Sequence, residues 1–216
     1  MLKYILIFAT AIFINQFYNS YTSHQENRKD IVPYAFTENK EGNYEAVVRL
    51  YHGNVMCSGV VVSDAYVLTA AHCAVGSTRF MTKDEVQVDS SRSEYTAAKG
   101  HFVALDHEKD IALLRGNFHD FKHLPVQFNY NPVYGQGLAV CGFPNNSSLE
   151  CHVVTFYANY GFQYGVKGAP LQHGQSGGPV LIKIDDAVFV VAVNSAVAAD
   201  VSVLSPTVGL DGLFGI

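Results

Sequence analysis

The amino-acid sequence predicts an all-β protein built as a sandwich or a barrel. Short apolar or alternating runs rich in Val, Ile, Phe and Tyr recur along the chain, and turn residues such as Gly53, Asn54 and Pro144 separate them. After the N-terminal segment no long stretch shows sustained helical periodicity. The strands expected on these grounds are, in chain order, Tyr44–Tyr51, Val55–Val62, His101–Asp106, Ile111–Leu114, Gly137–Gly142, Glu150–Tyr157, Pro179–Ile184 and Ala187–Val197.

The composition is that of a folded domain and argues against a disordered chain or a polytopic membrane protein. Of the 216 residues, 49% are hydrophobic and 15% are charged, which is an ordinary globular balance. The 18 Gly, 13 Tyr and 14 Phe favour strands joined by tight turns. The formal net charge of −5 provides no basic excess to neutralise phosphates, so we expect no nucleic-acid partner.

The N-terminus has the pattern of a secretory signal. A short basic start is followed by the apolar run Tyr4–Ile14, which is too short for an ordinary spanning helix. We therefore expect a signal peptide over residues 1–23 and a polar arm over residues 24–43, with an uncleaved membrane anchor as the alternative. Either interpretation places the rest of the chain in a secreted or extracytoplasmic, oxidising environment.

The chain has four cysteines, an even number that suggests two disulfides in a secreted protein. Four cysteines allow three pairings, and the simplest joins neighbours in sequence, Cys57 with Cys73 and Cys141 with Cys151. Free buried thiols are the alternative if the chain stays in a reducing compartment. No CxxC or paired-histidine spacing indicates zinc, so we expect no metal site.

Three motifs carry the functional prediction: CSGVVVSDAYVLTAAHC over Cys57–Cys73, DIALL beginning at Asp110, and GQSGGPV over Gly174–Val180. Together they resemble the trypsin/chymotrypsin-like serine peptidases, and the resemblance covers roughly Tyr44–Val197. It implies two six-stranded antiparallel Greek-key β-barrels with the active site between them. A composition break near Phe121–Pro132 separates the halves.

The first barrel is accordingly expected over residues 44–122 and the second over residues 123–216. The resemblance also implies the roles of the catalytic residues. Ser176 would be the nucleophile and His72 the base that activates its hydroxyl. Asp110 would hold the His72 tautomer; Asp106 and His107 are nearby rivals, but only Asp110 carries the apolar run that follows this aspartate in the family.

The GQSGGP motif matches the family around the nucleophile and departs from it at one position. The N–H groups of Gly174 and Ser176 would form the oxyanion hole. Gln175 stands where trypsin-like zymogens carry an Asp that pairs with a freed N-terminal amine. A glutamine offers that amine no charge, so we predict that activity does not depend on insertion of a new N-terminus such as Ile31.

The resemblance places the substrate pocket less firmly. Pro170 would lie at its floor, His173 at its mouth, and Ser195 and Val197 on the strand edge that binds the substrate backbone. An uncharged floor and a valine in place of the usual glycine favour small or apolar side chains at the cleaved position. A preference for acidic side chains, assisted by His173, is the alternative.

The C-terminus departs from the family as well. Trypsin-like relatives usually end in a helix, but no helical pattern is visible after Val197, and Val201–Leu204 is expected to close the second barrel as a final strand.

The sequence thus predicts a secreted serine endopeptidase, a hydrolase that acts through an acyl-enzyme intermediate on polypeptide substrates. We expect no cofactor, a monomer, and membrane contact only if the N-terminal segment is uncleaved. The alternative is a catalytically inactive serine protease homologue that acts as a binding module.

Overall fold

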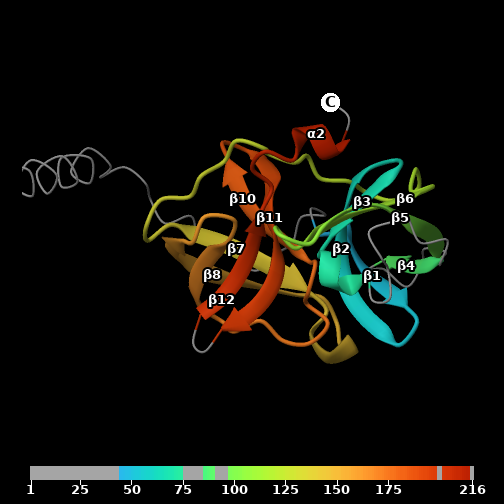
Figure 1. Ribbon diagram of the computed structural model, residues 1–216, viewed down its shortest axis with the longest axis horizontal. Coiled ribbons are helices and arrows are strands. Elements are labelled where there is room, and N and C mark those ends of the chain that lie inside the picture. The colour runs from blue at the N-terminus through green and yellow to red at the C-terminus, as the bar shows by residue number, and fades with distance from the viewer. Residues whose placement is uncertain (1–43, 75–84, 91–96, 199–200, 215–216) are drawn as a thin grey trace, which may run out of the picture. The chain divides into compact units, whose positions relative to one another are not determined.

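The computed structural model describes residues 44–74, 85–90, 97–198 and 201–214, which form two closed β-barrels (Figure 1). The predicted signal peptide, the arm and Ile31 lie outside the described residues. Every pairing between neighbouring strands within each barrel is antiparallel. The predicted double-barrel fold is therefore confirmed.

The first barrel contains six strands in the order β1-β2-β3-β6-β5-β4. In the strands Val47–His52 and Val86–Ser90, buried valine and leucine side chains alternate with more exposed polar ones, and the barrel core packs around Phe102 and Leu114. Its strands are β1 (Val47–His52), β2 (Val55–Ser63), β3 (Tyr66–Thr69), β4 (Val86–Ser90), β5 (Ala98–Asp106) and β6 (Ile111–Gly116).

The second barrel also contains six strands, in the order β10-β11-β12-β9-β8-β7. Its own core is built around Leu138, Phe156, Tyr164 and Leu204. Its strands are β7 (Gly137–Gly142), β8 (Glu150–Asn159), β9 (Tyr164–Gly168), β10 (Pro179–Ile184), β11 (Ala187–Ala198) and β12 (Val201–Pro206).

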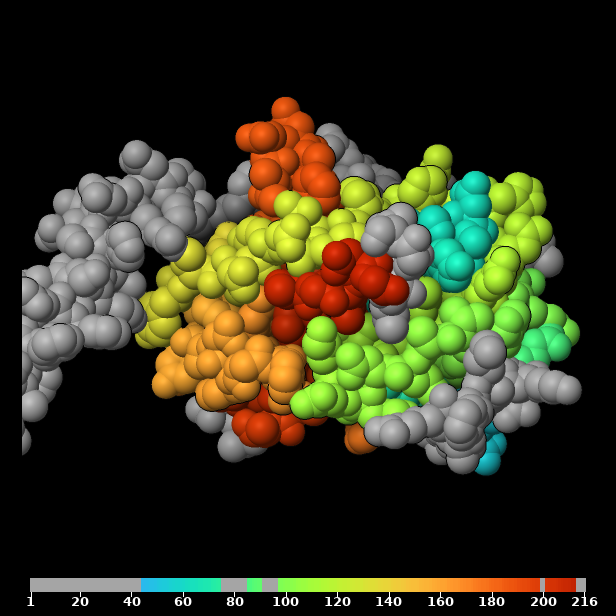
Figure 2. Space-filling view, turned by 45° about the horizontal axis from the view of Figure 1, so that its top comes forward, coloured from blue at the N-terminus to red at the C-terminus, as the bar shows by residue number. Residues whose placement is uncertain are grey.

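The two barrels share an apolar core where they meet. Side chains of the first barrel such as Leu68 and Leu113 pack in one cluster with Leu181 and Val193 of the second barrel. Leu210, just before the short helix α2 (Asp211–Phe214), belongs to the same cluster and is 2% exposed. Figure 2 shows the red C-terminal segment that contains α2 lying between green atoms of the first barrel and light orange atoms of the second.

Helix α2 is a single turn, so the expectation of no C-terminal helix was wrong only for these four residues, and β12 closes the second barrel between β11 and β9 as expected. No helix among the described residues is long and apolar enough to span a membrane.

Both disulfides join the cysteine pairs that the spacing favours. Cys57 on β2 is bonded to Cys73 at the end of the 3₁₀ helix η1 (Ala71–Cys73). Cys141 on β7 is bonded to Cys151, its register partner on β8. The first disulfide therefore ties the helical turn that carries His72 to a strand of the barrel wall.

Candidate active site

His72 lies on η1, directly after β3, at the seam between the barrels. Its Nδ1 lies 2.9 Å and 3.1 Å from the two carboxylate oxygens of Asp110, and its backbone N–H donates to Asp110 Oδ1 at 2.9 Å. A ring nitrogen of His72 also lies within 4.8 Å of both sulfurs of the Cys57–Cys73 disulfide. A carboxylate can only accept, so Nδ1 carries the hydrogen and Nε2 is the free base of the neutral ring.

Asp110 is the acid that meets His72, and its rival Asp106 is used elsewhere. The Asp106 carboxylate accepts the backbone N–H groups of Glu108 and Lys109 at 3.1 Å and 2.9 Å and so closes the turn before Asp110. Asp110 itself adopts a left-handed conformation with φ of 55°, an uncommon geometry for a residue with a side chain. This turn aims the Asp110 carboxylate at His72, and the buried strand β6 follows at once.

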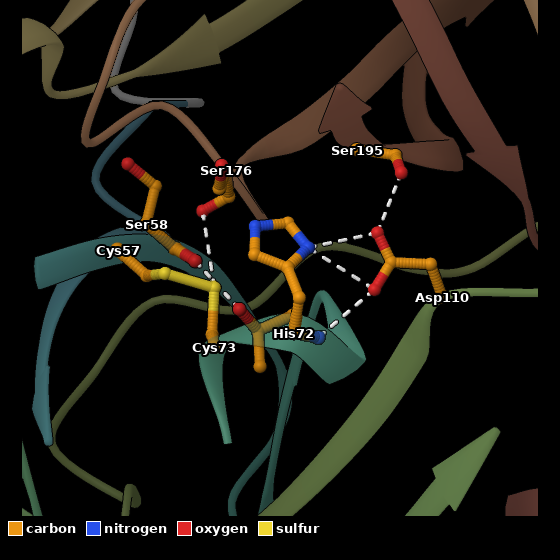
Figure 3. Close-up of polar contacts among 8 residues, drawn as sticks. Cys57, Ser58, His72, Cys73, Asp110, Ser176 and Ser195 are labelled. Atoms are coloured by element: carbon orange, nitrogen blue, oxygen red, sulfur yellow. Dashed lines mark hydrogen bonds and ion pairs between the residues drawn. A yellow bond between two sulfur atoms is a disulfide. The ribbon is translucent and has the colours of Figure 1, made fainter. Parts of the chain in front are cut away.

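Ser195 on β11 makes a contact that the sequence did not predict. Its hydroxyl donates to Asp110 Oδ2 at 2.5 Å, and its side chain is nearly buried. The second barrel therefore holds the carboxylate that orients a histidine of the first barrel (Figure 3). The family resemblance predicts Ser195 on the strand that binds the substrate backbone, and nothing in the sequence spacing links this residue to Asp110.

The pKa shifts of the pair follow from these contacts. The hydrogen bond to Asp110 raises the pKa of His72 above its ordinary value and outweighs the opposing effect of burial. Burial alone would raise the pKa of Asp110, but the hydrogen bonds from His72 and Ser195 together leave that pKa below its ordinary value. The pair thus combines an ionised carboxylate with a histidine of enhanced basicity.

Ser176 lies in the loop between β9 and β10, beside the ring nitrogen of His72 that does not face Asp110 (Figure 3). Its carbonyl accepts the backbone N–H of Ser58 at 2.8 Å, which fixes the loop against β2. Among the described residues no hydrogen bond joins His72 Nε2 to the Ser176 hydroxyl. Catalytic hydrogen bonds of this kind are often long without substrate and tighten when it binds.

The glycine after Ser176 is required by its surroundings. Gly177 has φ of 77°, and a Cβ there would lie 2.0 Å from Thr69 Oγ1 and 2.5 Å from the Ser58 carbonyl oxygen. A side chain at this position would push the loop away from the barrel wall and would also strain the backbone. The glycine thus permits Ser176 to approach the first barrel.

The backbone before Ser176 presents two N–H groups. The His173 carbonyl accepts the N–H of Asn145 at 2.7 Å, and across a trans peptide the N–H of Gly174 must therefore point away from Asn145. Gly174 reaches this orientation with φ of 89°. Neither this N–H nor that of Ser176 donates to another described residue.

Gln175 replaces the expected aspartate and is 1% exposed. Its Oε1 accepts the N–H of Gln172 at 2.9 Å, and its carbonyl accepts Asn194 Nδ2 at 3.1 Å. The side chain therefore closes the loop on itself. Its Nε2 is buried without a partner among the described residues, and as a donor it cannot accept a hydrogen bond from an N-terminal amine.

We therefore predict that chains with N-terminal extensions keep their activity. Forms that begin with a non-native tag and forms cleaved before Ile31 should show kcat/KM values within about threefold of each other, because the loop around Gln175 needs no inserted charge. Peptide hydrolysis by both forms measures this. Strict dependence on a free amine at Ile31 would refute the prediction.

The residues assigned to the substrate pocket lie in different environments. Pro170 and His173 are exposed in the loop after β9, and Val197, at 47% exposure, lies near the end of β11. Ser195 is nearly buried, with its hydroxyl directed at Asp110. Pro170 and His173 lie in the same loop as Ser176, and the His173 carbonyl accepts the N–H of Asn145, which ties this loop to the turn after β7.

Two six-stranded barrels with a histidine–carboxylate pair and a serine loop at their seam define a protein of the trypsin-like class. The profile of the trypsin-like peptidase domain matches residues 57–193, more than half of the chain. The chain belongs to this family, as the three sequence motifs predicted.

Individual relatives agree with this membership. The chain is 29% identical to mouse kallikrein-8 over 61% of its own length and 65% of that protein, and so spans less than two thirds of this relative. Its fold is similar to that of the serine endoprotease from Yersinia pestis, with a TM-score of 0.62 and 20% identity over 76% of this chain and 59% of the other. It is also similar to the Rv3671c protease in an inactive form, with a TM-score of 0.58 and 21% identity over 75% and 83% of the two chains.

Proposed function

We propose that the protein is a secreted serine endopeptidase that cleaves polypeptides through Ser176, His72 and Asp110. The observation that carries the proposal is the orientation of His72: Nδ1 is bound to Asp110 and the opposite nitrogen faces Ser176. Family membership supports the chemistry, and the two disulfides support an extracytoplasmic location.

The reaction begins when the Ser176 hydroxyl oxygen attacks the scissile carbonyl carbon. A serine hydroxyl is a weak nucleophile at neutral pH, so His72 Nε2 takes its proton as the new bond forms. Asp110 holds the ring with Nε2 available and stabilises the imidazolium that results. The Ser195 hydroxyl keeps the Asp110 carboxylate in place during this step.

The carbonyl oxygen becomes an oxyanion and receives hydrogen bonds from the N–H groups of Gly174 and Ser176. The intermediate collapses when the C–N bond breaks and His72 passes its proton to the leaving amine. Water then attacks the acyl group on Ser176, again with His72 as base, and releases the new carboxyl terminus. The reaction requires no cofactor.

The proposed substrate preference is for small or apolar side chains at the cleaved position. The exposed residues Pro170 and Val197 bring no charge to this region. A preference for acidic side chains, assisted by the exposed His173, is the alternative.

Profiling cleavage with a diverse peptide library tests the proposal, with Ser176→Ala as the blank. Cleavage by the wild-type chain alone, after a restricted set of side chains, is the expected result. No cleavage by a folded wild-type chain with or without its N-terminal arm would instead favour the inactive homologue that acts as a binding module.

We predict that activity falls at acidic pH as His72 becomes protonated. Because the pKa of His72 is raised, the midpoint should lie above the ordinary histidine value of about 6.5, while Asp110, whose pKa is lowered, stays ionised throughout. The profile of kcat/KM between about pH 5 and 9 measures this. A flat profile, or a midpoint well below about 6, would exclude His72 as the base.

A further inference from the structure

The two N–H groups assigned to the oxyanion hole belong to Gly174 and Ser176. One residue, Ser58, donates a hydrogen bond to the backbone carbonyl of each. The Ser58 hydroxyl donates to the Gly174 carbonyl at 2.7 Å, and the Ser58 backbone N–H donates to the Ser176 carbonyl at 2.8 Å. Ser58 lies on β2 in the first barrel, whereas both carbonyls belong to the second barrel. Figure 3 shows Ser58 on its strand next to Ser176.

The Ser58 side chain is fully buried and its hydroxyl makes two bonds. Besides donating to Gly174, its oxygen accepts the backbone N–H of Phe143 at 3.0 Å. A hydroxyl can donate and accept at once, and alanine can do neither. The space is tight, because a Cβ added at Gly142 would lie 2.9 Å from this hydroxyl.

A second set of hydrogen bonds holds the carbonyl of His173, which precedes Gly174 in the chain. The backbone N–H of Asn145 fixes the His173 carbonyl, and the turn that carries Asn145 is tied to strand β1. The Tyr51 hydroxyl donates to Asn146 Oδ1 at 2.9 Å in this same turn. Arg49 on β1 adds a bond from its guanidinium to the carbonyl of Ser147 at 2.7 Å.

We propose that Ser58 is a positioning residue for the oxyanion hole and that the β1-bound turn around Asn145 assists it. The inference rests on the proposed function, since it concerns the same site. The N–H groups of Gly174 and Ser176 lie in the peptide groups of the preceding carbonyls, those of His173 and Gln175, which the N–H of Asn145 and the Nδ2 of Asn194 hold. Ser58 fixes the carbonyl on the other side of each residue, so the two N–H groups keep their direction without an ion pair at Gln175. Hydrogen bonds from the first barrel to the Ser176 loop thus determine how well the two N–H groups stabilise the oxyanion of the transition state.

The test compares Ser58→Ala with Ser63→Ala, a matched change at the C-terminal end of β2, where the hydroxyl accepts the N–H of Ala65 and has no other hydrogen bond within the described part of the chain. Each variant is assayed for kcat and KM on a cleaved peptide and for inhibition by the corresponding peptide aldehyde. The aldehyde forms a tetrahedral adduct on the nucleophile and places its oxygen in the hole. Misplacing a hole donor should lower kcat and weaken aldehyde binding by about 10- to 100-fold, with KM within about threefold.

Ser63→Ala should match the wild type in all three values. Tyr51→Phe removes an exposed hydroxyl and should shift kcat and aldehyde binding in the same direction by about threefold, so it decides the case if Ser58→Ala does not fold. Unchanged aldehyde binding in a folded Ser58→Ala would overturn the inference. If Ser58→Ala does not fold, unchanged aldehyde binding in Tyr51→Phe would overturn it. A wild-type chain that cleaves nothing and does not react with the aldehyde would instead overturn the proposed function.

Discussion

Replacing Ser176 with alanine is expected to lower kcat by about 10⁶-fold, to the level that binding and the oxyanion hole alone provide. The change removes the only atom that forms the acyl bond in the proposed reaction. The measurement is hydrolysis of a peptide found in the library profile, at enzyme concentrations high enough to detect slow turnover.

The protein should remain folded after this substitution. The bond that fixes the loop runs from the Ser58 N–H to the Ser176 carbonyl, which alanine retains. A melting temperature within a few degrees of the wild type is the control. Ser176→Ala that retains a tenth of the wild-type kcat would show that another residue is the nucleophile.

Replacing Asp110 with asparagine is expected to lower kcat by about 10⁴-fold. The asparagine amide can donate a hydrogen to His72 Nδ1 and so favours the tautomer whose Nε2 already carries a proton. Loss of the carboxylate should also move the acidic limb of the pH profile to lower pH, because the hydrogen bond to Asp110 is what raises the pKa of His72. The kcat values and the pH profile measure both effects.

Asp106→Asn is the matched control for this change. Its side-chain oxygen can still accept the N–H groups of Glu108 and Lys109, and it has no contact with His72 among the described residues. Its kcat should stay within about threefold of the wild type. Equal losses in Asp106→Asn and Asp110→Asn would contradict the assignment of Asp110.

The strands that could be predicted from the sequence are those of six or more residues, which stand out as apolar or alternating runs. β3 was missed because it has only four residues and stands inside the motif that leads to His72, directly after Asp64 and Ala65. β9 was missed because its sequence, YGVKG, contains two glycines and little alternation. β4 is only five residues long and stands apart from the other apolar runs.

The site divides in a similar way. The three proposed catalytic residues, His72, Asp110 and Ser176, could be predicted because each stands in a short motif that is visible along the chain. The bond from Ser195 to Asp110 and the bonds of Ser58 to the nucleophile loop join residues far apart in sequence. Serines are common on strands, so only the fold shows which of them meet a carboxylate or a carbonyl.

The most direct test of the central claim is reaction with a fluorophosphonate, which phosphonylates a serine, with loss of fluoride, only where a base and an oxyanion hole activate it. The account predicts one adduct per chain, mapped by mass spectrometry to the peptide that contains Ser176, with labelling that slows at pH values below the pKa of His72. A folded wild-type chain that acquires no adduct, or one that acquires it on another serine, would contradict the account.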